Sequence, residues 1–166
     1  MQRFLCIALF TVLSSLPLTA QTPRVKPEDF RPLTGDPWIG TLVYRDYRSN
    51  KEVSIPSNLK VTQSAEKKLS WIFEYEYPDE PKANSKENVV FSEDGTSIDD
   101  EKIVERESLA GGAVRLVTER RGKDNDQDAL IRHTYLIASS SFSIKKEVRQ
   151  EGSTQFYERN RYVWRR

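Results

Sequence analysis

Near residue 40 the chain reads Trp38-Ile-Gly-Thr-Leu-Val-Tyr-Arg-Asp-Tyr47, directly after Gly35-Asp-Pro37. Trp38, Leu42 and Tyr44 fall on one face of an extended chain, with Gly40 between them. This period of two is typical of a β-strand, because apolar side chains on a helix recur every three to four residues. We therefore expect the folded part of the chain to begin with a strand over residues 38–47.

The same alternation recurs to the end of the chain, interrupted by short polar turns. We expect further strands at 53–63, 68–77, 88–92, 97–99, 102–109, 113–121, 129–139, 142–150 and 153–165. Pro56 predicts a bulge or an edge position in the second run. Neither face of 102–109 is clearly apolar, so a helix is the alternative there. Asp94-Gly95 indicates a tight hairpin, and residues 122–128 are expected to form a polar loop.

Evenly spaced runs of this kind favour an all-β fold. We predict an antiparallel up-and-down β-barrel of about eight to ten strands, which leaves no free sheet edge. A β-sandwich is the alternative. The barrel is expected to be a single domain over residues 38–166.

The N-terminal residues indicate export. Residues 1–20 have the pattern of a secretory signal peptide: Arg3, an apolar run over 4–13, and Ala20 as the small residue before cleavage. The apolar run is shorter than the roughly 20 residues of a membrane-spanning helix. We therefore expect a periplasmic or secreted protein with no integral membrane span once this segment is removed. Residues 21–37 are rich in proline and are predicted to form an extended arm, with Phe30 and Leu33 packed on the body.

Composition excludes several classes of partner and site. Cys6 is the only cysteine and lies within the signal segment, so the remaining chain has no thiolate for a metal or a thioester. Loss of the signal segment removes one base, Arg3, and leaves 25 basic against 25 acidic side chains. A general nucleic-acid binder needs an excess of positive charge. We therefore expect no nucleic-acid partner.

One predicted strand carries an unusual number of aromatic side chains. Over residues 68–77 a single face holds Trp71, Phe73, Tyr75 and Tyr77. Core packing is the first explanation of such a face, and the wall of a ligand cavity is the alternative, because apolar pockets are lined with aromatic side chains. We name Trp71, Phe73 and Tyr75 as candidate ligand-binding residues.

No catalytic motif stands in the sequence. His133 is the only histidine, and no serine near it has the context of a nucleophile. Asp124, Asp126 and Asp128 alternate like calcium ligands, but Ala129 occupies the position where an EF-hand loop has glycine. We predict a protein that is not an enzyme and has no cofactor or metal.

The hexapeptide Gly35-Asp-Pro-Trp-Ile-Gly40 resembles the first-strand signature of the lipocalin and fatty-acid-binding superfamily, the calycins. In that family the tryptophan closes one end of the barrel and a basic residue late in the chain packs across it. The resemblance assigns these roles to Trp38 and to Arg159, Arg161 or Arg165, of which we name Arg161.

The same resemblance implies an interior that binds a small apolar molecule. Fatty-acid-binding barrels hold an acyl carboxylate with inward arginine and tyrosine, which implies Arg132 and Tyr135 here. Trp38-x-Gly40 is also similar to the opening of the ten-stranded nitrobindins, and that likeness implies His133 as a haem ligand.

The leading hypothesis is therefore a non-catalytic exported barrel that binds a small hydrophobic or amphipathic ligand. One alternative is a cell-envelope module with a filled core that acts through its surface or as a structural part. A haem-binding, nitrobindin-like barrel is the second alternative.

Overall fold

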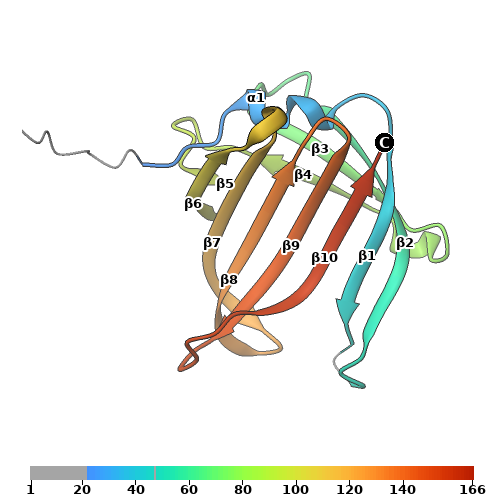
Figure 1. Ribbon diagram of the computed structural model, residues 1–166, viewed down its shortest axis with the longest axis vertical. Coiled ribbons are helices and arrows are strands. Elements are labelled where there is room, and N and C mark those ends of the chain that lie inside the picture. Colours follow the sequence, from blue (N-terminus) through green and yellow to red (C-terminus); the bar gives the residue numbers. More distant parts are fainter. Residues whose placement is uncertain (1–21, 47) are drawn as a thin grey trace, which may run out of the picture.

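The computed structural model describes residues 22–46 and 48–166, and Figure 1 shows their arrangement. The predicted signal segment 1–20 and Tyr47 lie outside the described residues. Ten strands form in the described part of the chain, all within one antiparallel sheet. They are β1 (Trp38–Arg45), β2 (Glu52–Gln63), β3 (Ser70–Glu76), β4 (Ser85–Val90), β5 (Ser97–Ile98), β6 (Glu101–Ser108), β7 (Val114–Asp124), β8 (Gln127–Ile137), β9 (Ser141–Gln150) and β10 (Tyr157–Arg165).

The strands follow an up-and-down order, so the prediction of an antiparallel up-and-down barrel is confirmed. Each strand pairs with its neighbours in the sequence except across the gap from β4 to β5, and β1 also pairs with β10. The two ends of the sheet meet at an isolated bridge between Phe91 and Ile98. Beside that bridge the Val90 N–H donates to Asp99 Oδ1 at 2.8 Å. The barrel is therefore nearly closed, with a short seam between β4 and β5.

One local prediction is corrected by the structure, and two are confirmed. Residues 122–128 form no loop: β7 and β8 continue to a tight turn at Asn125 and Asp126, whose φ angles of 51° and 64° suit a two-residue hairpin. Pro56 lies within β2 opposite Thr41 without a bulge, but the ladder between β2 and β3 begins only at Asn58, so Pro56 is at a local edge, as predicted. The strand predicted over 102–109 is confirmed as β6, and a register shift between Ile103 and Glu105 explains why its alternation is blurred.

The N-terminal arm is helical in part instead of extended. Pro27–Phe30 forms the short helix α1 and Arg31–Leu33 forms the 3₁₀ turn η1. Proline is compatible with a first helical turn, because its missing N–H has no partner there in any helix. Phe30 and Leu33 are fully buried, as predicted. Figure 1 shows α1 lying over the end of the barrel where β6 and β7 meet.

That end of the barrel is filled by aromatic side chains. The Phe30 ring lies 5.5 Å from Trp71 and 4.8 Å from Phe91, and Trp164 stacks on Phe142 at 5.2 Å. Gly40 makes room for this cluster, since a β-carbon there would lie only 2.6 Å from Trp164 Cδ1. We call this cluster the aromatic plug: Phe30, Trp38, Trp71, Phe73, Phe91, Phe142 and Trp164.

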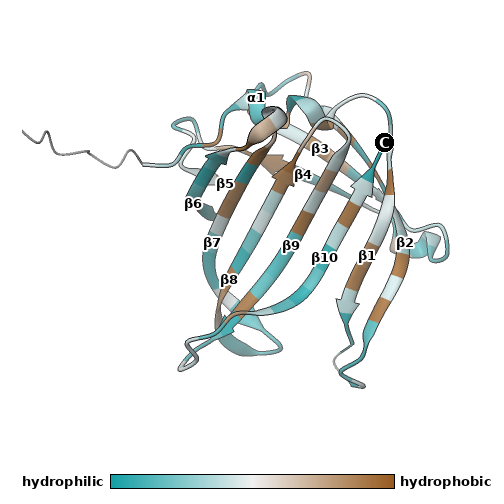
Figure 2. Ribbon diagram, viewed as in Figure 1, coloured by the Kyte–Doolittle hydropathy of each residue, from teal (hydrophilic) through white to brown (hydrophobic). Residues whose placement is uncertain are grey.

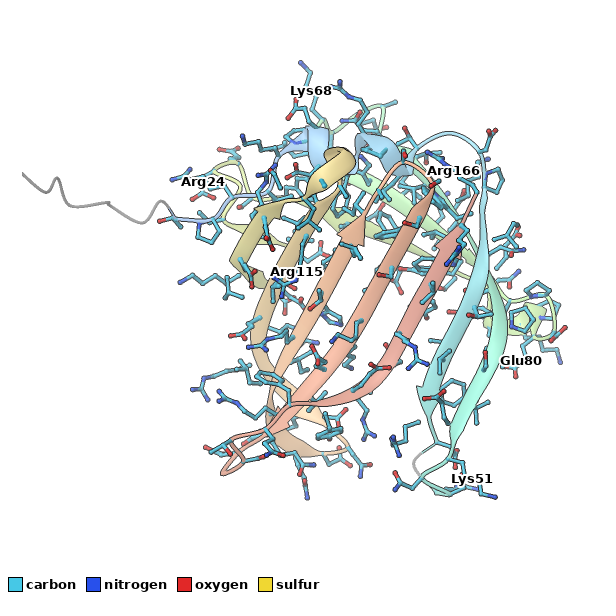
Figure 3. The ribbon with its side chains drawn as sticks, viewed as in Figure 1. Arg24, Lys51, Lys68, Glu80, Arg115 and Arg166 are labelled. Atoms are coloured by element: carbon cyan, nitrogen blue, oxygen red, sulfur yellow. The ribbon has the colours of Figure 1, made fainter. Side chains whose placement is uncertain are left out.

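The outer face of the sheet is polar and charged. Figure 2 shows hydrophilic and hydrophobic residues alternating along the front strands, as expected where one face is buried and the other is in water. Figure 3 shows Lys51, Lys68 and Arg115 on the outside of the barrel. Arg115 pairs with Glu105 across neighbouring strands. None of the helices in residues 22–46 and 48–166 is long and apolar enough to cross a membrane.

Candidate ligand-binding site in the barrel interior

The half of the barrel away from the aromatic plug is not filled. A cavity of about 250 Å³ lies there, bounded by side chains from β3, β4, β5, β6, β8, β9 and β10. A second cavity, of about 390 Å³, adjoins it on the β1 and β2 side and shares Lys146 and Asn160 with it. We call the first the inner cavity. Its walls are Phe73, Tyr75, Glu87, Val89, Ile98, Asp99, Asp100, Glu101, His133, Tyr135, Ile144, Lys146, Asn160 and Tyr162.

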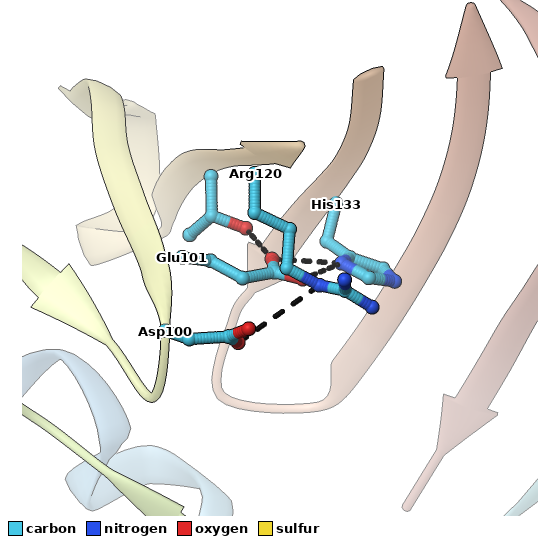
Figure 4. A network of polar contacts seen from close by, with 5 residues as sticks. Asp100, Glu101, Arg120 and His133 are labelled. Atoms are coloured by element: carbon cyan, nitrogen blue, oxygen red, sulfur yellow. Dashed lines mark hydrogen bonds and ion pairs between the residues drawn. The ribbon is translucent and has the colours of Figure 1, made fainter. Parts of the chain in front are cut away.

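Glu101 is the centre of a polar network on one wall of the inner cavity (Figure 4). Its side chain lies at the start of β6 and is almost fully buried. His133 Nδ1 on β8 lies 2.8 Å from Glu101 Oε2, and Arg120 Nε on β7 donates to Oε1 at 3.1 Å. The Thr118 hydroxyl donates to the same carboxylate. Every face of this buried carboxylate therefore meets a donor or a cation, as a buried charge requires.

Electrostatics keep Glu101 ionised. Burial alone would raise the pKa of this carboxyl group, but the hydrogen bond and charge of His133 act in the opposite direction, together with Thr118 and Arg120. The net effect is a pKa below its ordinary value of 4.5. Asp99 behaves differently: burial raises its pKa, and the neighbouring acids Glu101 and Asp100 add to the increase.

Tyrosine side chains line the opposite part of the inner cavity. The hydroxyl groups of Tyr77 and Tyr162 lie 2.8 Å apart, and the Tyr162 ring stacks on Trp164 at 4.9 Å. Tyr75 is only 7% exposed, its ring lies 5.5 Å from that of Tyr162, and within the described residues its hydroxyl has no hydrogen-bond partner. Burial raises the pKa of Tyr75, Tyr135 and Tyr162. These phenols are therefore neutral at physiological pH and can both donate and accept.

The predicted ligand-binding residues divide between plug and cavity. Tyr75 and Tyr135 line the inner cavity, and Phe73 lies at its border with the aromatic plug. Trp71 belongs to the plug and does not line the cavity. Arg132 lies on the outer face, where it pairs with Glu119 at 2.8 Å and its guanidinium covers the Phe156 ring at 3.8 Å. The expected inward Arg132 is therefore wrong, because His133 and Tyr135 occupy the inner face of β8.

The expected pair at the end of the barrel, Trp38 and Arg161, is found for Trp38 but not for Arg161. Trp38 is fully buried in the plug, and its indole N–H donates to the Leu33 carbonyl at 2.9 Å. The cation packed across its ring is Arg166, whose guanidinium carbon lies 4.2 Å from the ring centre. Arg161 instead pairs on the surface with Glu52 and Glu158. The prediction of Arg161 is therefore corrected to Arg166.

Several residues of the site were missed by sequence reasoning. Glu87, Lys146, Asn160 and Tyr162 line the inner cavity, and Glu101 anchors its polar wall. Glu87 and Lys146 carry charges within strands, where the usual interpretation is an outer face. The available signal was positional: Lys146 follows Phe142 and Ile144 at a period of two, so all three side chains share one face.

The interior contains a residue suited to acid–base chemistry, His133. Nδ1 of His133 is held by Glu101, an arrangement that orients an imidazole for acid–base work. The described residues that line the inner cavity include no serine, threonine or cysteine, and the nearby Thr118 hydroxyl is engaged with Glu101. Within residues 22–46 and 48–166 no three His, Cys, Asp or Glu side chains are grouped so as to hold a metal ion.

Haem fits this interior poorly. His133 faces inward with a carboxylate on Nδ1, as metal-bound histidines often do. However, Glu87, Asp99 and Asp100 line the same cavity, and haem carries anionic propionates. The inner cavity of about 250 Å³ is also smaller than the roughly 300–1,000 Å³ typical for drug-sized ligands. Comparison with known proteins adds no assignment, since no family model and no curated protein matches the chain.

Proposed function

We propose that this protein is a non-catalytic, exported, lipocalin-like barrel that binds a small amphipathic ligand in its interior. The observation that carries the proposal is the division of the interior: one half is filled by the aromatic plug, while the other holds the inner cavity. A barrel with a purely structural role gains stability from a core packed throughout. The open half therefore favours a carrier over a module with a filled core.

The chemistry of the walls favours an amphipathic ligand over a fully apolar one. Phe73, Val89 and Ile144 supply apolar surface, whereas Tyr75 and Tyr135 present hydroxyl groups. The Tyr75 side chain is mostly buried, and its hydroxyl has no protein partner in the described residues. A ligand that carries a donor or acceptor can supply this hydroxyl with a hydrogen bond. Export is supported by the signal pattern of residues 1–20.

A thermal-shift experiment with neutral amphiphiles tests this proposal. Phenethyl alcohol, indole and octanol are added to the wild type, to Ile144→Trp, which fills the inner cavity, and to Ile39→Trp. Ile39 is 61% exposed on the outer face, so this variant is a matched control. A ligand specific to the folded state raises Tm with its concentration.

We expect at least one amphiphile to raise Tm of the wild type and of Ile39→Trp, but not of a folded Ile144→Trp. Equal responses of all three proteins, or none in the wild type, would contradict the proposal. Far-ultraviolet circular dichroism verifies that each variant is folded.

A further inference from the structure

The charges around the inner cavity are strongly unequal on its two sides. Glu87, Asp99, Asp100 and Glu101 lie at the β4–β5 seam and the start of β6, whereas Lys146 is the one lysine or arginine among the described lining residues. Arg120 is engaged with Glu101 at 3.1 Å. For Glu87 and Asp99, no basic group lies within ion-pairing distance in the described part of the chain. Arg120 also lies 3.9 Å from Asp100. The negative charge that the protein does not neutralise is therefore that of Glu87 and Asp99, two partly solvated side chains at the seam.

Lys146 projects from β9 and lies across the barrel from Glu87, because β9 is five strands from β4 in the order of strands. Lys146 is also the cross-strand neighbour of His133, so it lies beside the wall that holds the Glu101 network. The field across the cavity consequently points from Lys146 toward the seam, and a cation inside is pushed from one wall and attracted by the other. The charges in the cavity thus select the sign and the orientation of a charged ligand.

Aromatic rings form the walls between these two sides. Tyr75 and Tyr162 lie 5.5 Å apart, and Phe73 lies 6.3 Å from Tyr75. Faces of such rings attract organic cations. The Tyr75 side chain is only 7% exposed and lines the cavity, and its hydroxyl, which has no hydrogen-bond partner in the described residues, can accept from an ammonium N–H there. This hydroxyl is a second observation, independent of the acidic side chains, that indicates a bound ligand.

We propose that the ligand is a small organic cation, in which an ammonium group is joined to a ring or a short apolar chain. This inference rests on the proposed carrier function and specifies its ligand class. The ammonium faces Glu87 and Asp99, and the apolar body packs among Phe73, Tyr75 and Tyr162. The part of the ligand that the inner cavity of about 250 Å³ holds is small, because pockets for drug-sized ligands begin near 300 Å³.

Three probes of nearly equal size separate charge from shape. Phenethylamine is a cation at neutral pH, phenethyl alcohol is neutral and phenylacetate is an anion. Isothermal titration calorimetry of the protein purified from its own host gives the affinity for each probe. We expect phenethylamine to bind most tightly and phenylacetate least, and the preference for the cation to decrease as salt is added.

Three variants localise the effect. Glu87→Gln removes one carboxylate at the cavity. It is expected to weaken the binding of phenethylamine about tenfold, which is the factor for one charge-assisted hydrogen bond. The affinity for phenethyl alcohol is expected to stay the same. Glu93→Gln makes the same change in net charge at an exposed position that does not line the cavity and is expected to leave both affinities unchanged. Tyr75→Phe is expected to weaken the binding of both phenethylamine and phenethyl alcohol.

The outcomes separate the two proposals. Tighter binding of phenylacetate or of phenethyl alcohol than of phenethylamine would overturn the cation inference and leave the carrier function intact. Equal weakening by Glu87→Gln and Glu93→Gln would also overturn it, because the effect would then come from net charge. Failure of all three probes, together with no response to the neutral amphiphiles above, would overturn both proposals.

Discussion

His133 Nδ1 lies 2.8 Å from Glu101 Oε2 inside the barrel, and this contact connects β8 to β6 across the intervening strand β7. β7 contributes Thr118 and Arg120 to the same carboxylate. On its other side β6 pairs only with the two residues of β5. The backbone hydrogen bonds of the sheet therefore hold β6 weakly on that side, and the polar network adds to its attachment. The same network forms one wall of the inner cavity.

Replacement of Glu101 by glutamine is expected to lower the free energy of unfolding by about 2 kcal/mol at neutral pH, since the buried donors lose a charged acceptor. The pKa of Glu101 is lowered in the folded state. Its contribution is therefore present above the ordinary value of 4.5 and is lost as pH falls through the folded-state pKa. Urea unfolding at pH 7 and pH 3 measures this difference. A wild-type advantage of equal size at both pH values would contradict the prediction.

Truncation of Trp71 and of Tyr75 should have contrasting effects. Trp71 is fully buried in the aromatic plug, where its ring lies 4.4 Å from Phe91. Trp71→Ala is expected to cost about 3–5 kcal/mol of stability. Tyr75→Phe removes one hydroxyl that has no partner in the described residues and is expected to change stability by less than about 0.5 kcal/mol. Chemical denaturation measures both, and a large loss in Tyr75→Phe would show that its hydroxyl has a structural role.

The N-terminal arm is attached by a buried ion pair. Asp29 is 4% exposed and accepts from Arg106 Nε at 2.9 Å. Asp29→Asn leaves the guanidinium without its charged partner and is expected to cost about 3 kcal/mol. Asp36→Asn, on the exposed part of the same arm, is the control and is expected to be nearly neutral. Faster hydrogen exchange of residues 25–34 in Asp29→Asn alone would support the attachment, and equal exchange in both variants would contradict it.

Arg166, in place of the predicted Arg161, covers Trp38. Its guanidinium also donates to the carbonyl oxygens of Thr34 and Asp36 at 3.0 and 3.3 Å. Arg166→Ala is expected to lower stability by about 1–2 kcal/mol, through loss of a cation–π contact and these hydrogen bonds. Arg161→Ala removes exposed ion pairs and is expected to cost less than about 1 kcal/mol. The reverse order of unfolding midpoints would contradict the assignment.

The fold could be predicted from the sequence because a strand buried on one face has apolar side chains at every second position. That pattern is strong in β3, where every second side chain over Trp71, Phe73 and Tyr75 is aromatic and buried. It is weak in β6, where a bulge next to Val104 changes the face of the residues that follow. Turn chemistry was equally local: Gly95 has the positive φ of 72° expected of a turn. The strands on either side of that turn, β4 and β5, meet at a single bridge and form no tight two-stranded hairpin.

The candidate site was harder to predict from the sequence, because it depends on contacts between residues that are distant in the chain. Arg132 and His133 are neighbours, and the pattern does not decide which of two polar side chains enters a barrel whose interior is itself polar. The pairing of Arg166 with Trp38 depends on where the arm turns, and that turn is set by the burial of Phe30 and Leu33. Lys146 and Glu87 meet the same cavity from strands on opposite walls, a relationship that no single segment encodes.

The central claim is that the interior holds a small molecule, and native mass spectrometry tests it most directly. The protein is purified without detergent from its own host as wild type, Ile144→Trp and Ile39→Trp. We predict a reproducible added mass on the wild type and on Ile39→Trp that is lost on denaturation and is absent from a folded Ile144→Trp. A bare polypeptide mass for the wild type, persisting after incubation with small molecules extracted from the host, would contradict the claim.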